Sequence, residues 1–156
     1  DCGQPFTVVV DYAHTTESLN SLLQLYHELT KGKLYVVFGA TGGGRDKAKR
    51  PKMGEAADHF ADYVILTDDD PYEEDEWQII EDIAQGIKRN EGDKFWKIPS
   101  REEAITLALS LAQSGDTVVI AGKGAEEVQV IHGKSIPWDD RKVVRNILSR
   151  EMRVDL

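Results

Sequence analysis

Residues 34–66, LYVVFGATGGGRDKAKRPKMGEAADHFADYVIL, decide the fold. The two ends of this stretch, Leu34–Phe38 and Tyr63–Leu66, are short apolar runs rich in β-branched and aromatic residues. Continuous runs of this kind are typical of strands that are buried on both faces of a parallel sheet. Between them lie a glycine-rich loop and a segment of helical pattern, in which Pro51 suits the first turn. The stretch therefore predicts one strand–helix–strand unit.

The same alternation extends over the rest of the chain. Further strands are expected at Thr7–Val10 and Thr117–Ala121, with a weaker one at Lys94–Ile98. Gly32 is expected to end the first long helix at its C′ position. Apolar residues spaced three and four apart predict helices with these inward-facing stripes: Leu19, Leu22, Leu23, Tyr26 and Leu29; Trp77, Ile80, Ile83, Ala84 and Ile87; Ile105, Ala108, Leu109 and Ala112; Val143, Val144, Ile147 and Leu148.

A small hairpin, in which Val128–Ile131 pairs with Ser135–Ile136, is expected near the C-terminus. Alternating strands and helices place parallel strands side by side, with helices packed on both faces. The sequence therefore predicts an α/β, doubly wound domain with a mostly parallel sheet of about six strands. We expect residues 1–5 to be the tail of a linker, residues 6–150 to form the domain and residues 151–156 to be a short tail.

Length and composition limit the possible classes of protein. A chain of 156 residues is long enough for one domain with a single core. The net charge of −9 and the sequence pI near 4.9 argue against a general nucleic-acid binder. No apolar run approaches the roughly 18 residues that a membrane span needs. The single cysteine, Cys2, fits a reducing cytoplasm, and the absence of an initiator Met leads us to expect a fragment of a longer protein.

The loops that follow the expected strands carry most of the charged and glycine-rich chemistry. In a doubly wound sheet, ligands bind at the carboxyl ends of the strands. The five loops at these ends read DYAHTT (11–16), GATGGGRDKAKRP (39–51), TDDDPYEED (67–75), PS (99–100) and AGKGAEE (121–127). We expect a binding site at this edge, although acidic loops also occur simply as solvated surface.

None of these loops fits a known phosphate cradle. The pattern GxxxxGK[ST] fails, because Arg45 and Asp46 stand where Lys and a hydroxyl residue are needed. The dinucleotide fingerprint GxGxxG is absent as well. Arg45 instead suits the planar, bidentate capture of a carboxylate. A glycine-rich turn followed by a solvated basic run remains the alternative, and no metal site is assigned.

Four motifs follow one another along the chain: VVVDYAHT, VVFGxxGGxRDKxKRPxMGxAA, an Asp-Pro loop after the third strand, and AGKGxE. Their order and content resemble the C-terminal domain of the Mur ligases from Gly3 to about Leu148. The MurE type, the UDP-N-acetylmuramoyl-tripeptide synthetases of peptidoglycan synthesis, is the most similar. The resemblance implies a Rossmann-like domain of a cytoplasmic, ATP-dependent amide ligase that has three domains.

The resemblance also implies which partners the chain has. ATP and Mg²⁺ would be bound mainly by a central domain that this chain lacks, so the chain alone is expected to be inactive. The substrates would be an amino acid and UDP-N-acetylmuramoyl-L-alanyl-D-glutamate, which the missing N-terminal and central domains help to hold. Nucleic acid and membranes are not expected as partners.

The resemblance assigns roles to individual residues. Arg45 would hold the carboxylate of the incoming amino acid. Asp11 and His14 would meet the nucleotide, with His14 as the catalytic residue, unless His14 merely precedes a helix cap. Lys123 is open to interpretation as a simple loop lysine. The remaining polar contacts to the amino acid would come from Asp70, Gly122 and Glu126. We expect Asp69 and Tyr72, which lie in the same acidic loop as Asp70, to contact the amino acid as well.

The chain departs from the family pattern in three places. Thr16 stands where the first loop usually has proline, and Ala125 replaces the histidine of AGKGHE, which puts the orientation of Glu126 in doubt. The Asp-Asn-Pro-Arg motif that selects diaminopimelate reads Asp-Asp-Pro-Tyr and ends at Tyr72. Without the arginine, a distal carboxylate would meet like charge, so the expected acceptor is a diamino acid with one carboxylate, lysine before ornithine. Replacement cations remain possible in Lys47, Lys49 and Arg101.

Two other functions compete with this interpretation. Asp11, Asp68–Asp70, Ser100 and Lys123 suggest a phospho-accepting receiver domain, but receivers have a pair of acids after the first strand, and here Tyr12 follows Asp11. The second alternative is a related ligase of the folylpolyglutamate or poly-γ-glutamate type. The RDKAKRP stretch is the main feature that separates the chain from that second class.

Overall fold

The computed structural model describes residues 2–44 and 46–154, and its strands and helices alternate as the sequence predicts. In chain order the elements are β1 (Thr7–Asp11), α1 (Thr16–Leu29), β2 (Leu34–Phe38), α2 (Lys49–Phe60), β3 (Tyr63–Leu66), α3 (Glu76–Ala84), β4 (Phe95–Lys97), α4 (Arg101–Leu111), β5 (Thr117–Ala121), β6 (Val128–Ile131), β7 (Lys134–Pro137) and α5 (Asp140–Val154).

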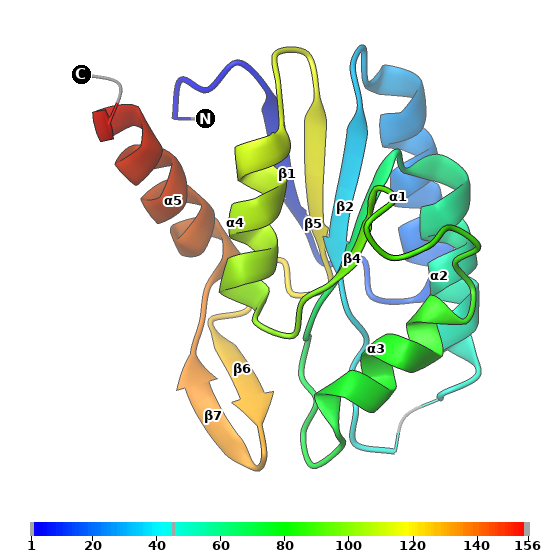
Figure 1. Ribbon diagram of the computed structural model, residues 1–156. Coiled ribbons are helices and arrows are strands. Elements are labelled where there is room, and N and C mark those ends of the chain that lie inside the picture. Colours follow the sequence, from blue (N-terminus) through cyan, green and yellow to red (C-terminus); the bar gives the residue numbers. More distant parts are fainter. Residues whose placement is uncertain (1, 45, 155–156) are drawn as a thin grey trace.

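Five strands form one parallel sheet in the order β1-β5-β2-β3-β4 (Figure 1). The predicted doubly wound α/β class is confirmed, with five strands where about six were expected. The predicted hairpin is also present, because β6 and β7 pair antiparallel as a separate sheet. Residue Asp11 pairs with Ala121, and Phe38 pairs with Leu66, so neighbouring strands end at the same edge.

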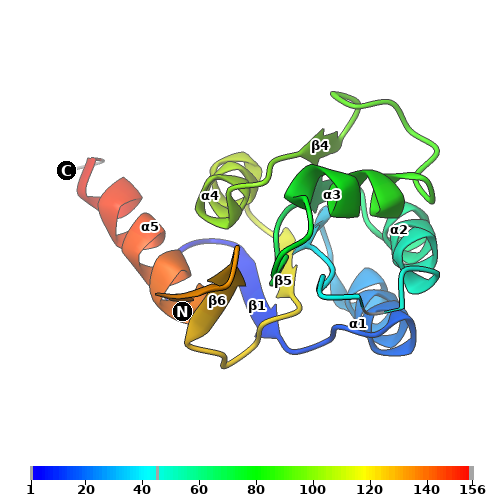
Figure 2. The same cartoon turned by 90° about the horizontal axis from the view of Figure 1, so that it is seen from below.

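Helices cover both faces of the sheet (Figure 2), with α1, α2 and α3 on one face and α4 and α5 on the other. The side chains of successive β2 residues point to opposite faces of the sheet. Leu34, Val36 and Phe38 pack in the core beneath α1–α3, whereas Tyr35 and Val37 pack in the core beneath α4 and α5. Every residue of β2 is buried, which explains why its apolar run is continuous.

Two local predictions are wrong. Helix α1 ends at Leu29, and the next residue caps it in an extended conformation, so Gly32 is not the C′ residue. A Cβ at Gly32 would instead collide with the side chain of Asp116. The second concerns the inward-facing stripes, because Leu29 and Trp77 are 63 % and 50 % exposed. The inward stripe of α3 is made by Ile79, Ile80 and Ile83.

The ends of the expected domain are structured. The carbonyl of Pro5 accepts a hydrogen bond from the amide of Gly115, and α5 continues through residues 151–154. Among the described helices, none combines the length and the apolarity that a membrane crossing requires.

Candidate active site

The loops at the carboxyl edge of the sheet converge on Lys123. This lysine is fully buried, and its Nζ atom lies 2.9 Å from Asp70 Oδ1, 3.1 Å from Glu126 Oε2 and 3.8 Å from Asp69 Oδ1. We call these three acids and the lysine the carboxylate cluster. Burial alone would lower the pKa of Lys123, but the hydrogen bond to Asp70 and the neighbouring charges outweigh it and hold the pKa above its ordinary value. The lysine is therefore charged.

The cluster joins two loops that are far apart in the sequence. Asp69 and Asp70 follow β3, whereas Lys123 and Glu126 follow β5. Three of the residues expected to contact an amino acid are thus brought together, and the interpretation of Lys123 as a simple loop lysine is wrong. The sequence held no signal for its burial, because a lysine between glycines reads equally well as solvated.

Gly122 is fixed in this site by the carboxylate beside it. Its φ of +116° lies in the region that favours glycine, and a Cβ there would collide with Asp69 Oδ2. Burial raises the pKa of Asp69, although Arg101 and Lys123 oppose that rise. The Gly122 amide donates to the carbonyl of Asp11, which links this loop to the end of β1.

Tyr72 connects three segments of the site. Its amide donates to the Val130 carbonyl at 3.1 Å, and its own carbonyl accepts from the His132 amide at 2.7 Å. The backbone at Tyr72 is left-handed, with a φ of +54°, and its ring lies 3.3 Å from where a Cβ of Gly43 would be. The hairpin is therefore fastened to the acidic loop through the residue that departs from the family pattern.

Arg45 lies outside the described residues, and the segments on either side of it make specific contacts. The Gly44 amide donates to Glu74 Oε1 at 3.1 Å. Arg50 is fully buried and pairs with Glu74 at 3.1 Å and Asp82 at 2.9 Å. Burial alone would raise the pKa of Glu74, but the Gly44 amide and Arg50 hold it below its ordinary value. The basic run is therefore not uniformly solvated: Arg50 is an internal anchor, while Lys47 stays exposed.

Arg101 is a second buried anchor. It pairs with Asp140 at the start of α5 and also donates to the carbonyls of Asp68 and Ala121. These contacts fix the carboxyl ends of β3 and β5 against α5. Arg101 is thus occupied, and it is not available as the replacement cation that the sequence left open.

Asp11 is the last residue of β1, and His14 lies on the loop that leads from β1 to α1. Asp11 Oδ1 accepts from the Ala13 amide at 2.8 Å, and His14 Nδ1 donates to the Tyr12 carbonyl at 2.9 Å. The exposed Tyr12 ring lies 4.5 Å from the His14 ring, between centroids. Among the described contacts, none joins His14 to the carboxylate cluster, so the acids and the histidine form two neighbouring parts of the edge.

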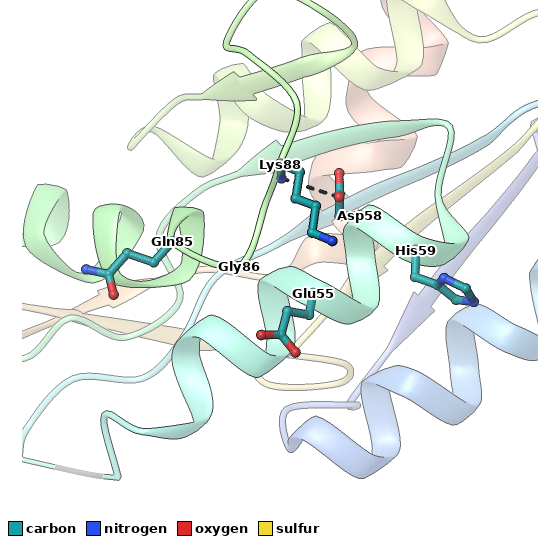
Figure 3. A pocket seen from close by; sticks show the side chains of 6 residues that line it. All are labelled: Glu55, Asp58, His59, Gln85, Gly86 and Lys88. Carbon is teal, nitrogen blue, oxygen red and sulfur yellow. Dashed lines mark hydrogen bonds between the residues drawn. The ribbon is translucent and has the colours of Figure 1, made fainter.

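Hollows occur both at this edge and away from it. A hollow of about 280 Å³ separates the starts of α1 and α2, where Lys49 and Lys52 contribute to its wall. A larger one of about 540 Å³ lies between the second half of α2 and the end of α3 (Figure 3). It is lined by Glu55, Asp58, His59, Gln85, Gly86 and Lys88, none of which comes from the edge loops. Within the described residues, no group of His, Cys, Asp and Glu side chains is arranged to hold a metal ion.

Comparison with known proteins relates this edge to one family. Residues 1–124 match the family described as "Mur ligase, glutamate ligase domain". The UDP-N-acetylmuramoyl-L-alanyl-D-glutamate–2,6-diaminopimelate ligase of Syntrophomonas wolfei is 45 % identical over 153 residues, which are 98 % of this chain and 31 % of that protein. The ligase of the same name from Aquifex aeolicus is 48 % identical over 143 residues, which are 92 % of this chain and 29 % of that protein.

Two solved structures are similar to this chain, one in sequence and fold and the other in fold alone. A structure of a ligase with that name has a TM-score of 0.88 and 42 % identity, and the match covers 96 % of this chain and 30 % of that one. The E. coli FolC protein in complex with ADP shares the fold alone, with a TM-score of 0.55 and 18 % identity over 96 % of this chain and 30 % of that chain. The chain thus spans less than a third of the length of these relatives.

Proposed function

Since the chain belongs to the Mur ligase family, as a glutamate ligase domain, we propose that it is the acceptor-binding domain of a cytoplasmic ATP-dependent amide ligase. The full enzyme would add the third amino acid to UDP-N-acetylmuramoyl-L-alanyl-D-glutamate. The observation that carries the proposal is the carboxylate cluster, which gathers Asp69, Asp70 and Glu126 at the sheet edge where ligands bind. Membership of this family also removes the receiver domain as an alternative.

The division of labour between the domains follows from the chemistry. In the proposed reaction, ATP would phosphorylate the D-glutamate carboxylate and leave as ADP. The amine of the incoming amino acid would then attack the acyl phosphate, form the amide and displace inorganic phosphate. The described loops offer no phosphate cradle, so we assign the ATP phosphates and Mg²⁺ to the central domain. Asp11 and His14 are suited to the ribose side of the nucleotide, because Asp11 ends β1 at this edge and His14 lies in the loop that follows it. This chain's task is positioning, which converts a bimolecular attack into an oriented one.

The acceptor is proposed to be a diamino acid with a single carboxylate, L-lysine first. The carboxylate cluster holds three acids and one lysine, so its excess charge favours the cationic nitrogens of such a ligand. Within the described part of the chain, each buried cation around the Tyr72 loop is already paired: Arg50 with Glu74 and Asp82, Arg101 with Asp140, and Lys123 with Asp70. A second carboxylate would therefore find little compensation there.

Meso-diaminopimelate is the second candidate, because the relatives that cover most of this chain are named as diaminopimelate ligases. Arg45 and the exposed Lys134 of the hairpin are the cations through which it would be accommodated. Glutamate addition to a folate-like acceptor has less support, since the likeness to FolC extends to the fold alone.

The proposal is tested with the full-length enzyme, UDP-N-acetylmuramoyl-L-alanyl-D-glutamate, Mg²⁺-ATP and an equimolar mixture of amino acids. Mass spectrometry of the products is expected to show one added diamino acid and stoichiometric release of phosphate. An enzyme that forms no tripeptide product, or that extends only a folate-type substrate with glutamate, would contradict the proposal.

A further inference from the structure

Glu126 is oriented by a residue of its own turn. Its amide donates to the Lys123 carbonyl at 3.0 Å, and its carboxylate Oε2 lies 3.1 Å from Lys123 Nζ. The Glu126 side chain is 38 % exposed, whereas Lys123 is fully buried. Among the described residues, no protein donor is recorded for the second oxygen of Glu126, Oε1. One oxygen is therefore fixed by the lysine, and the other is left for a ligand.

The lysine is itself fixed from behind. Asp70 Oδ1 accepts from Lys123 Nζ at 2.9 Å and from the Val130 amide at 2.9 Å. The hairpin thus fixes Asp70, Asp70 fixes Lys123, and Lys123 fixes Glu126. In this chain of contacts Asp70 Oδ1 accepts from two protein donors and the Asp70 side chain is 13 % exposed, so Glu126 is the more accessible of the two acids.

We propose that Lys123 is a positioning residue that holds Glu126 in place for a cationic nitrogen of the acceptor amino acid. This inference rests on the proposed function and names the residue on which the acceptor contact depends. It also explains how this chain can carry Ala125 where the family pattern has histidine. Ala125 is exposed and lies in the same turn as Lys123 and Glu126. Because the lysine supplies the orientation, the side chain at position 125 is not needed for it. A charge-assisted hydrogen bond of this kind narrows the orientations open to a carboxylate.

The test is a double-mutant cycle in the full-length enzyme with Lys123→Met, Glu126→Gln and the double variant. Each single change is expected to raise the acceptor KM about tenfold, and the double variant is expected to be no worse than either. The KM values for ATP and for the UDP-dipeptide should stay unchanged, and Lys123→Arg should restore most of the acceptor affinity. The exposed Lys31→Met serves as the matched control.

Additive losses in the cycle, or an unchanged acceptor KM in Lys123→Met, would overturn the inference. If Lys123→Met does not fold, the cycle is repeated in an Asp70→Asn background, where removing the lysine leaves no unpaired buried anion at position 70. Calorimetric Kd values for L-lysine and meso-diaminopimelate are measured alongside. An enzyme that binds a diamino acid but ligates none would contradict the proposed function alone. The double-mutant cycle, measured on the Kd values, would still decide the role of Lys123.

Discussion

Arg101 and Asp140 form a fully buried, two-pronged ion pair, with Nε 2.8 Å from Oδ1 and Nη2 2.7 Å from Oδ2. The pair joins the first residue of α4 to the first residue of α5. The indole nitrogen of Trp138 also donates to Asp140 Oδ1, at 2.7 Å. Burial alone would lower the pKa of Arg101, but the bonds to Asp140 outweigh it and raise the pKa. The edge that carries the candidate site is therefore fastened by a charge pair in addition to the apolar contacts between α4, α5 and the sheet.

Arg101→Met is expected to destabilise the chain by about 3–5 kcal/mol, because it leaves Asp140 buried without its partner. Urea unfolding followed by circular dichroism measures the difference. The exposed Arg145→Met is the control and should change the free energy of unfolding by less than about 0.5 kcal/mol. A loss below about 1 kcal/mol for Arg101→Met would show that the pair is dispensable.

Asp68 should make stability depend on pH. Burial, with Glu76 adding repulsion, raises the pKa of Asp68 to about 7, against an ordinary value of 3.8. Between these values the folded state binds more protons than the unfolded state, so this contribution to stability is present at low pH and is lost as the pH rises through 7. Asp68→Asn should thus be more stable than the parent at pH 8 and equal to it near pH 4.

The comparison of unfolding free energies at the two pH values isolates this residue, since every other group is common to both proteins. The exposed Asp93→Asn should show no such difference. A gap between parent and Asp68→Asn that is the same at pH 4 and pH 8 would rule out the titration.

Gly122 and Gly92 separate the cost of backbone strain from the cost of a collision. Both have positive φ, +116° and +88°, but a Cβ at Gly92 meets nothing within 4 Å, whereas one at Gly122 meets Asp69 Oδ2. Gly92→Ala is expected to cost about 1–2 kcal/mol, and Gly122→Ala about 3 kcal/mol or more. Thermal and urea unfolding measure both. Equal costs would mean that Asp69 moves aside freely.

Arg45 is expected to hold the carboxylate of the acceptor amino acid, as the resemblance to the family implies. In the full-length enzyme, Arg45→Ala should raise the acceptor KM about ten- to a hundredfold, which corresponds to the roughly 1.5–3 kcal/mol of a charge-assisted bond. Lys88→Ala, at an exposed position away from the edge, is the control. An acceptor KM that does not change would return Arg45 to the solvated basic run.

The sheet could be predicted from the sequence because each of its central strands is a continuous apolar run. All five residues of β2 and of β5 are buried, and no other strand among the described residues has that pattern at that length. Positions of the helices followed from their apolar spacing, and the misplaced Trp77 shows the limit of that signal. The apolar spacing is satisfied by Trp77 as well as by Ile79, so the spacing alone could not show that Ile79 is the buried residue.

The charged framework of the site could not be predicted in the same way. Arg50, Arg101 and Lys123 are all fully buried, yet each stands in a polar segment that reads as surface. Their partners Asp82, Asp140 and Asp70 lie at least 32 residues away along the chain, and only the fold brings them together. The resemblance to a family identified the acids of the site, but not the cations that arrange them.

The most direct test of the account is a competition between acceptors in the full-length enzyme, scored as kcat/KM for L-lysine, L-ornithine and meso-diaminopimelate. We predict that L-lysine is preferred over meso-diaminopimelate by about tenfold or more, because Tyr72 offers no charge to a distal carboxylate and the buried cations described around it are paired. A preference of about tenfold for meso-diaminopimelate would contradict it, and a cation that compensates for Tyr72 would then have to be found.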